Sequence, residues 1–191
     1  MKILGIMGSP RMRGNTDLLL DEALRAASGQ GAETEKISVD KLKISPCKED
    51  YACLKDGNCD IRDAMDEIYP KLLGADGVIV ASPIFFYGLT SQAKALIDRC
   101  QALWARKYVL KQKPPGSGRK GAFIAVGATK GEKLFEGSIL TVKYFFQTIG
   151  VDYAGDLLIR GIDKKGEIRE HPTALRDAAE LGKRLALRSP E

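Results

Sequence analysis

Five short apolar segments recur along the chain, and a helix-like segment follows each of them. The apolar segments are rich in β-branched residues, and each runs into residues typical of a turn. Because parallel strands need long crossover connections, this alternation predicts a parallel sheet with helices on both faces. We expect strands at 2–8, 32–39, 76–83, 120–128 and 152–161. We expect helices at Thr16–Ser28, Ile61–Leu73, Thr90–Ala105, Lys133–Gly150 and Pro172–Leu187.

The length of the chain fits one such sheet. A core of this size is ordinary for 191 residues, so we expect one domain over residues 1–191. No apolar run approaches the roughly 20 residues that a membrane helix needs. The first residues lead straight into a strand pattern, without the features of a signal peptide. We therefore expect a cytoplasmic protein without a membrane partner.

The net charge of +5 raises the question of a nucleic-acid partner. The basic residues are dispersed except in residues 106–120, where six lysines and arginines occur without an acidic residue. No helix-turn-helix, zinc-finger or RNP-like aromatic motif accompanies them. We interpret this segment as a solvated loop and expect no nucleic-acid partner.

The turn after the first expected strand reads GSPRMRGNT and is rich in hydrogen-bond donors. The N–H groups and the dipole of the following helix favour an anion there. Ser9, Asn15 and Thr16 add neutral donors, and Arg11 can supply a charged fork. The turn lacks the Walker A and G-x-G-x-x-G patterns, so a monophosphate suits it better than a pyrophosphate. The alternative is a plain turn in which Thr16 and Asp17 cap the helix.

The turn after the third expected strand reads SPIFFYGLT and is unusually aromatic for a solvent-exposed loop. Such a loop either covers a flat apolar ligand or packs against a partner subunit, and Thr90 can cap the helix that follows. Ligands of doubly wound sheets bind at the carboxyl ends of the strands. We therefore expect this turn, the first turn and the turn after the fourth strand to surround one crevice.

These two motifs, GSPRMRGNT and SPIFFYGLTSQAKALIDR, resemble the NADPH-dependent FMN reductase family, in particular its iron–sulfur flavoprotein branch. The resemblance implies an α/β, flavodoxin-like, doubly wound sheet of five parallel strands in the order 2-1-3-4-5. It implies that the FMN phosphate is held by Ser9, Arg11, Asn15 and Thr16. It implies that the isoalloxazine ring is flanked by Pro83, Ile84, Phe85, Phe86, Tyr87 and Gly88.

The turn after the fourth strand is placed at the same crevice by position alone. It would form a third wall, made of Ala128, Thr129, Lys130 and Gly131. We expect backbone amides of residues 84–88 near the ring edge, together with a positive charge such as Lys130, to set the flavin potential.

Three cysteines, Cys47, Cys53 and Cys59, occur in one expected loop at 46–60. In a cytoplasmic protein such a group indicates metal or redox chemistry more than disulfides, and its spacing does not suit zinc. The iron–sulfur branch carries a Cys-x2-Cys-x2-Cys-x4–7-Cys motif that holds a 4Fe–4S cluster. This chain matches its first, third and fourth positions, whereas the second is Asp50.

The aspartate leaves three alternatives open, because a carboxylate is a harder ligand than the thiolates that normally hold iron in clusters. Asp50 can be the fourth ligand, a three-iron cluster can form, or the loop can lack a cluster. Outside the loop, we expect Cys100 to be a core residue and His171 a surface residue. Asp98 and Arg99 are expected to form ion pairs, either at a subunit contact or as a structural pair.

Together these observations predict an FMN-binding oxidoreductase that passes hydride or electrons from NAD(P)H to a flavin, quinone or other small acceptor. FMN supplies the reactive chemistry, so we expect no catalytic acid or base in the protein. One alternative is an electron carrier that accepts electrons from a ferredoxin-like partner through a cluster in the 47–59 loop. Another is an interaction module that uses the basic segment. We expect a homodimer or homotetramer, because the aromatic loop and apolar helices offer a contact surface.

Overall fold

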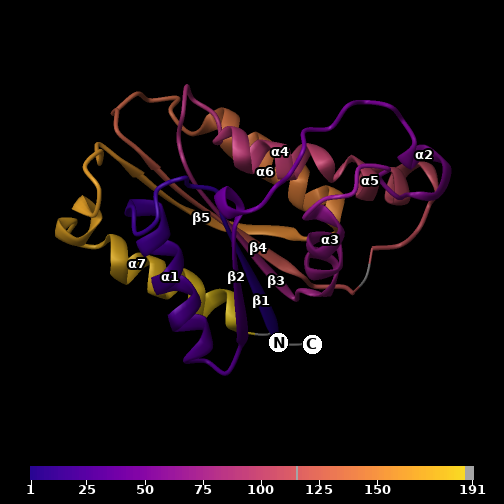
Figure 1. Cartoon of the computed structure of the whole chain (residues 1–191). Coiled ribbons are helices and arrows are strands. Elements are labelled where there is room, and N and C mark those ends of the chain that lie inside the picture. Colours follow the sequence, from indigo (N-terminus) through magenta and orange to yellow (C-terminus); the bar gives the residue numbers. More distant parts are fainter. Residues whose placement is uncertain (115, 188–191) are drawn as a thin grey trace.

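The computed structural model describes residues 1–114 and 116–187. Five parallel strands form one twisted sheet in the order β2-β1-β3-β4-β5 (Figure 1). The strands are β1 Lys2–Met7, β2 Glu33–Ser38, β3 Gly77–Pro83, β4 Lys120–Gly127 and β5 Asp152–Arg160. The expected strands and their flavodoxin-like order are confirmed.

The central strands β1, β3 and β4 are buried along almost their whole length, whereas the edge strands β2 and β5 are partly exposed. A strand that is covered on both faces has a nearly continuous apolar sequence. The segments of β1, β3 and β4 have such sequences. The centre of the sheet therefore follows from apolar burial.

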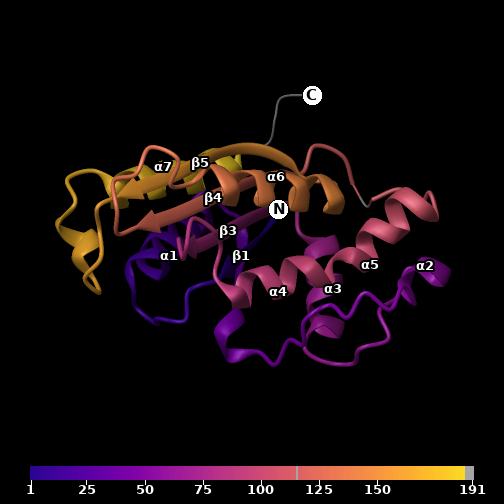
Figure 2. The ribbon, with the colours of Figure 1, turned by 90° about the horizontal axis from the view of Figure 1, so that it is seen from above.

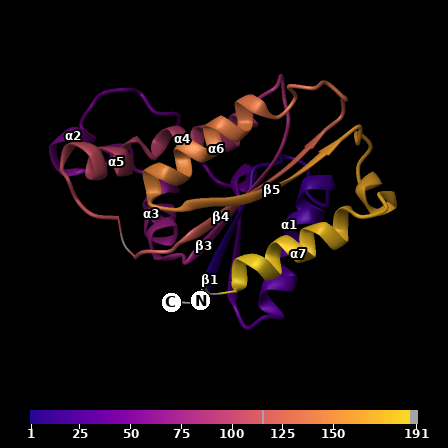
Figure 3. The same cartoon turned by 180° about the vertical axis from the view of Figure 1, so that it is seen from behind.

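Helices cover both faces of the sheet (Figures 1 and 3). One face carries α1 Asn15–Ser28 and α7 Ala174–Ala186, which pack against each other. The other face carries α3 Met65–Gly74, α4 Ser91–Arg99, α5 Gln101–Trp104 and α6 Glu136–Ile149. A short helix, α2 Cys53–Asp56, lies beside α5 at one end of the molecule (Figure 2). Within the described residues, no helix combines the length and apolar character that crossing a membrane requires.

Several helix boundaries differ from the expectation for local reasons. The expected helix from Ile61 begins only at Met65, whose N–H donates to Asp63 Oδ1 at 2.9 Å. The expected helix Thr90–Ala105 is divided at Cys100 and is followed by a π-helical turn, Ala105–Val109. Thr90 does cap it, since its hydroxyl accepts from the Ala93 N–H at 3.2 Å.

The expected caps of the first helix are wrong. The N-cap of α1 is Gly14, and no side chain within residues 1–114 and 116–187 caps the helix. Asp17 Oδ2 instead accepts a hydrogen bond from the Arg13 N–H at 2.7 Å, outside the helix. The first turn of α1 therefore keeps N–H groups without a side-chain partner.

The basic segment is not uniformly solvated, so the expectation of a solvated loop is wrong for two of its arginines. The buried Arg119 donates to the Ala75 carbonyl at 2.7 Å, to the Ile149 carbonyl at 2.6 Å and to the Leu72 carbonyl. Arg106 donates to the Gly57 carbonyl at 2.8 Å. These two side chains are structural anchors, because Arg119 satisfies three backbone carbonyls and Arg106 one, all far away in the sequence.

Candidate active site

A cavity of about 90 Å³ lies where the turns after β1, β3 and β4 meet. The first turn contributes Ser9, Arg11, Gly14, Asn15 and Thr16, the second contributes Pro83, Ile84 and Phe85, and the third contributes Ala128. The structure thus brings all four residues expected at the phosphate into one cavity with part of the aromatic loop. Ile162, Asp163 and Lys165 line the same cavity, and the sequence interpretation missed them.

The turn after β1 is shaped around the uncapped N-terminus of α1. Ser9 Oγ accepts from the Arg11 N–H at 3.1 Å, and the Gly14 N–H donates to the Arg11 carbonyl at 3.0 Å. A Cβ atom on Gly14 would lie only 2.9 Å from that carbonyl oxygen, so the turn requires glycine there. The N–H groups without a side-chain partner and the helix dipole favour an anion at this turn.

The acidic residue in the first turn of α1 does not oppose an anion. The buried Asp17 carboxylate accepts from the Arg13 N–H and also pairs with Lys36 Nζ at 2.9 Å. The negative charge of Asp17 is therefore balanced by Lys36 of β2, which is not one of the residues that line the cavity.

Asn15 connects the turn after β1 to a distant segment. Its Nδ2 donates to the Lys164 carbonyl at 2.9 Å, and its Oδ1 accepts from the Ile168 N–H at 3.2 Å. These two bonds explain how residues 162–165 reach the cavity. No local sequence signal predicts the contact, because its partners are joined only by the packing of α1 against α7 and the segment before it.

The first and second turns are joined at Gly8. The Thr90 hydroxyl donates to the Gly8 carbonyl at 2.5 Å, and the Gly8 N–H donates to the Ala81 carbonyl at 2.7 Å. A Cβ atom on Gly8 would lie 2.8 Å from the Cβ of Ala93 in α4. The glycine thus allows the start of α4 to approach the end of β1 closely.

The aromatic loop is a tight turn in a costly conformation. Phe85 and Gly88 exchange two backbone hydrogen bonds of 3.0 Å each, and between them Phe86 and Tyr87 have φ angles of 48° and 62°. Each non-glycine residue in this region costs roughly 1–2 kcal/mol. Phe86 is fully exposed, and about half of the Phe85 and Tyr87 side chains is exposed. Such strain and exposed aromatic area are typical of functional loops.

Internal hydrogen bonds leave few of the loop's amides for a ligand. The Ile84 N–H donates to the Val126 carbonyl at 2.9 Å, and those of Phe85 and Gly88 bond each other's carbonyl. Among the described residues, only the N–H groups of Phe86 and Tyr87 in the 84–88 stretch have no such partner. Of the backbone amides expected near the edge of a bound ring, only those of Phe86 and Tyr87 are therefore available.

The third turn meets the aromatic loop rather than the cavity. Apart from Ala128, its expected wall residues Thr129, Lys130 and Gly131 do not line the cavity. A Cβ atom on Gly131 would lie 2.5 Å from Tyr87 Oη, so the tyrosine packs directly over this glycine. Arg160 stabilises the turn by donating hydrogen bonds to the Gly131 and Glu132 carbonyls at 3.3 and 3.0 Å.

The cysteine loop encloses a second cavity of about 310 Å³. Cys47, Cys53, Cys59 and Asp50 all line it, together with residues at the junction of α4 and α5. All three thiols are free, and burial, with smaller contributions from Cys59 and Cys47, raises the pKa of the Cys53 thiol. Among the described residues, no three cysteine, histidine or acidic side chains are placed to hold a single metal ion.

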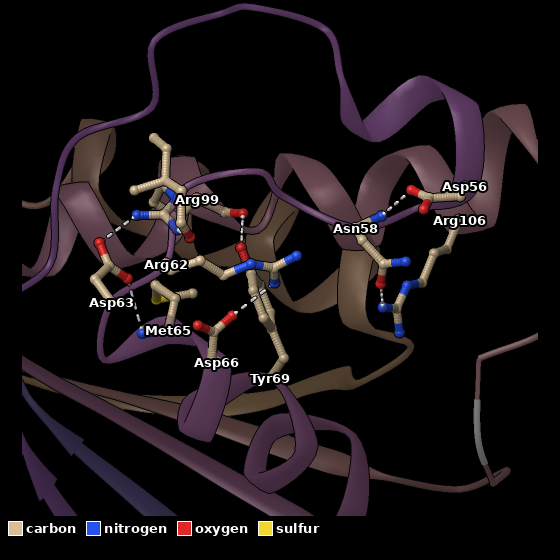
Figure 4. A network of polar contacts seen from close by, with 10 residues as sticks. Asp56, Asn58, Arg62, Asp63, Met65, Asp66, Tyr69, Arg99 and Arg106 are labelled. Carbon is tan, nitrogen blue, oxygen red and sulfur yellow. Dashed lines mark hydrogen bonds and ion pairs between the residues drawn. The ribbon is translucent and has the colours of Figure 1, made fainter.

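A buried arginine closes the base of this loop (Figure 4). Arg99 donates to the Ser45 carbonyl and the Ile61 carbonyl, each at 2.9 Å, and to Asp63 Oδ2 at 2.7 Å. Its Nε is buried and has no hydrogen-bond partner among the residues that the structure describes. Both Asp98 and Arg99 form ion pairs within the chain, as the structural alternative predicted. Asp98 binds Lys94 at 2.8 Å on the surface of α4, and Arg99 binds Asp63.

Two further expectations have clear outcomes. Cys100 lies in the core with 2% of its surface exposed, as expected. His171 is half-buried rather than a free surface residue, because its Nδ1 accepts from the Thr173 and Ala174 N–H groups at 3.3 and 3.1 Å. It therefore caps the start of α7.

The chain is similar in sequence to curated iron–sulfur flavoproteins. An iron–sulfur flavoprotein of Methanocaldococcus jannaschii is 36% identical, and the match covers 97% of this chain and 96% of that protein. An iron–sulfur flavoprotein of Archaeoglobus fulgidus is 40% identical over 73% of this chain and 69% of its own length.

The fold is shared with solved flavoenzyme structures. An NAD(P)H:quinone oxidoreductase from Methanothermobacter marburgensis superposes with a TM-score of 0.75 at 15% identity, covering 100% of this chain and 98% of that one. At 15% sequence identity, this similarity is evidence for a shared fold only. The model of the family described as NADPH-dependent FMN reductase matches residues 1–136, which include the first two turns and the cysteine loop. The chain therefore belongs to the NADPH-dependent FMN reductase family.

Proposed function

We propose that this protein is an FMN-dependent oxidoreductase that takes electrons from NAD(P)H and passes them to a flavin, quinone or other small acceptor. The observation that carries the proposal is the uncapped N-terminus of α1, which shares one cavity with Arg11, Thr16 and the start of the aromatic loop. Bound FMN would supply the hydride and electron chemistry, and the protein would bind and orient the reactants.

The residues have distinct roles in this proposal. Ser9, Arg11 and Thr16 bind the ribityl phosphate together with the first N–H groups of α1. Asn15 keeps the 162–168 segment against the turn through its two backbone hydrogen bonds. The N–H groups of Phe86 and Tyr87 are free to meet the polar edge of the ring, and the exposed aromatic side chains cover its face.

FMN titration of the apoprotein tests the phosphate site. We expect the Arg11→Ala/Thr16→Ala variant to bind FMN about 100-fold more weakly, because hydrogen bonds to a charged group contribute about 1.5–3 kcal/mol each. Arg13→Ala is the matched control, since Arg13 lies in the same turn but does not line the cavity. Unchanged FMN affinity in the double variant would contradict the proposal.

The acceptor is tested by activity. We expect the FMN-loaded protein to oxidise NADH or NADPH steadily when a free flavin or a quinone is added. Absence of turnover with every flavin and quinone, in protein that is fully loaded with FMN, would contradict the reductase function and favour a role as carrier.

A second candidate function is an electron carrier that receives electrons from a ferredoxin-like protein through an iron–sulfur cluster in the cysteine loop. The observation that favours it is that all three loop cysteines line one cavity. Several relatives are also named iron–sulfur flavoproteins. Iron and sulfide assays of anaerobically purified protein, with an absorption spectrum, test whether a cluster is present.

We also propose that the protein assembles as a homodimer or homotetramer through the aromatic loop and α6. Phe86 is fully exposed, and Leu140 and Tyr144 of α6 are 57% and 64% exposed. The Tyr87 carbonyl lies near Gly137 at the start of α6, so these apolar groups belong to adjoining surfaces. Light scattering at micromolar concentration tests this, and monodisperse monomers would contradict it.

A further inference from the structure

We infer that Asp50 is the fourth protein ligand of an iron–sulfur cluster in the cysteine cavity, so that one iron is bound by a carboxylate and is exchangeable. The inference rests on the second candidate function proposed above, and it concerns the one position at which this chain departs from the four-cysteine motif.

The donor set of the cavity fits a cluster better than a single ion. Cys47, Cys53, Cys59 and Asp50 line the same space of about 310 Å³. In a cubane cluster each iron takes one protein ligand, so the ligands stand apart around the cube rather than converging on one point. The absence of a preformed single-ion site among the described residues is therefore compatible with three thiolates and a carboxylate around a cluster.

Asp50 keeps one carboxylate oxygen available. Its Oδ1 accepts from the Ala52 N–H at 3.2 Å, and Oδ2 has no protein partner in the described part of the chain. The neighbouring Glu49 also lines the cavity, but its carboxylate accepts from Tyr51 Oη at 2.6 Å. Both Glu49 and Tyr51 have positive φ angles, of 56° and 59°, so the backbone on either side of Asp50 is held in an uncommon conformation.

Arg99 provides the second, independent observation. Arg99 is one of the residues around the same cavity, it is 1% exposed, and its Nε–H is buried without an acceptor in the described part of the chain. Such an orphaned donor costs free energy unless a partner is supplied. A cluster in the cavity would lie beside this guanidinium, and groups around the ligands tune the stability and the potential of a cluster. The guanidinium charge would also offset the negative charge of the bound group.

The ligand set predicts a specific chemistry. Carboxylate is a harder and weaker ligand for cluster iron than thiolate, so the iron at Asp50 is the one lost on oxidation. When ferricyanide takes one electron from the four-iron cluster, one ferrous ion leaves and a three-iron cluster remains on the three cysteines. Adding ferrous ion and one electron from dithionite reverses the change.

Anaerobic reconstitution of the FMN-loaded protein with iron and sulfide tests the inference. We expect about four irons per chain before one equivalent of ferricyanide and about three after it, together with the electron paramagnetic resonance signal of a three-iron cluster. Asp50→Cys should keep about four irons and show no such signal. Asp50→Ala should hold only about three irons from the start. Glu49→Gln is the matched control and should behave as the wild type.

The outcomes separate the two proposals. If the wild type binds a four-iron cluster but Asp50→Ala has the same iron content and the same response to ferricyanide, Asp50 is not a ligand. If the wild type binds FMN but takes up no iron, the cluster function fails together with this inference, whereas the flavin-dependent reductase function stands. The FMN content of each variant reports whether it has folded.

Discussion

Arg99 and Asp63 form an ion pair from which water is excluded, with Nη1 2.7 Å from Oδ2 and side-chain exposures of 0% and 6%. Arg99 ends α4, and Asp63 lies just before α3 (Figure 4). The same guanidinium also bonds the Ser45 and Ile61 carbonyls, which flank the cysteine loop. The pair therefore fixes the loop to the sheet-covering helices.

Removing either member of this pair should destabilise the fold strongly. We expect Arg99→Ala to lower the free energy of unfolding by about 3–5 kcal/mol, because it leaves Asp63 buried and unpaired. Chemical denaturation measures the loss. Arg62→Ala is the control, since Arg62 pairs with Asp66 at 3.3 Å on the surface and should cost at most about 1 kcal/mol. Equal effects of the two variants would show that the buried pair contributes no more than the exposed one.

The same pair predicts a pH dependence. Burial by itself would raise the pKa of Asp63, but hydrogen bonds from Arg99 and from the Ser45 and Met65 N–H groups outweigh it and lower that pKa. The resulting stabilisation is complete above the unfolded pKa of about 3.9 and is lost as the pH falls through the lower folded value. The stability difference between wild type and Asp63→Asn should therefore be constant near neutral pH and shrink below about pH 4. Denaturation curves between pH 3 and 7 measure this, and a constant difference would contradict it.

Thr90 links the two turns of the cavity, so its hydroxyl should affect both stability and FMN binding. We expect Thr90→Val to lower the free energy of unfolding by about 2–3 kcal/mol, because it removes the helix cap and the bond to the Gly8 carbonyl. FMN affinity should fall as well, and Thr90→Ser should restore both. The neighbouring exposed Ser91→Ala should change stability by less than about 0.5 kcal/mol. An unaltered FMN affinity in Thr90→Val would contradict the coupling of the turns.

The aromatic loop should show a conflict between stability and function. Phe86→Gly relieves a positive φ angle of 48° and should raise the free energy of unfolding by up to about 1 kcal/mol, while it weakens NAD(P)H-dependent turnover. Lys111→Gly is the matched control, because Lys111 has a φ angle of 55° far from the cavity. It should stabilise similarly and leave turnover unchanged. If the Phe86→Gly variant kept full turnover, the phenyl ring of Phe86 would have no functional role.

Gly182 is required by the contact between α7 and α1. A Cβ atom there would overlap the backbone carbonyl of Ala23. We expect Gly182→Ala to lower the free energy of unfolding by about 1–3 kcal/mol or more, because the two helices must separate. Gly74→Ala, where a Cβ meets nothing within 4 Å, should be neutral or slightly stabilising. Thermal unfolding compares the two, and equal melting temperatures would contradict the close helix contact.

The sequence pattern by itself determined the five strands and which of them lie at the centre of the sheet, whereas their order was implied by the family resemblance. Continuous apolar runs identified the central strands, because a strand buried on both faces carries mostly apolar side chains. The first turn also carried its own signal, since Ser9, Arg11 and Thr16 lie within a few residues of one another beside a helix start. These features are local, and local patterns are what a sequence displays.

Only the tertiary structure decided which distant groups complete the sites. Asn15 meets Lys164 and Ile168, and Arg99 meets Asp63 rather than its neighbour Asp98. Arg119, expected in a solvated loop, satisfies three carbonyls in the interior. In each case the partner is selected by which backbone carbonyls and charges the packed helices leave unsatisfied, and that depends on the three-dimensional arrangement of the whole chain.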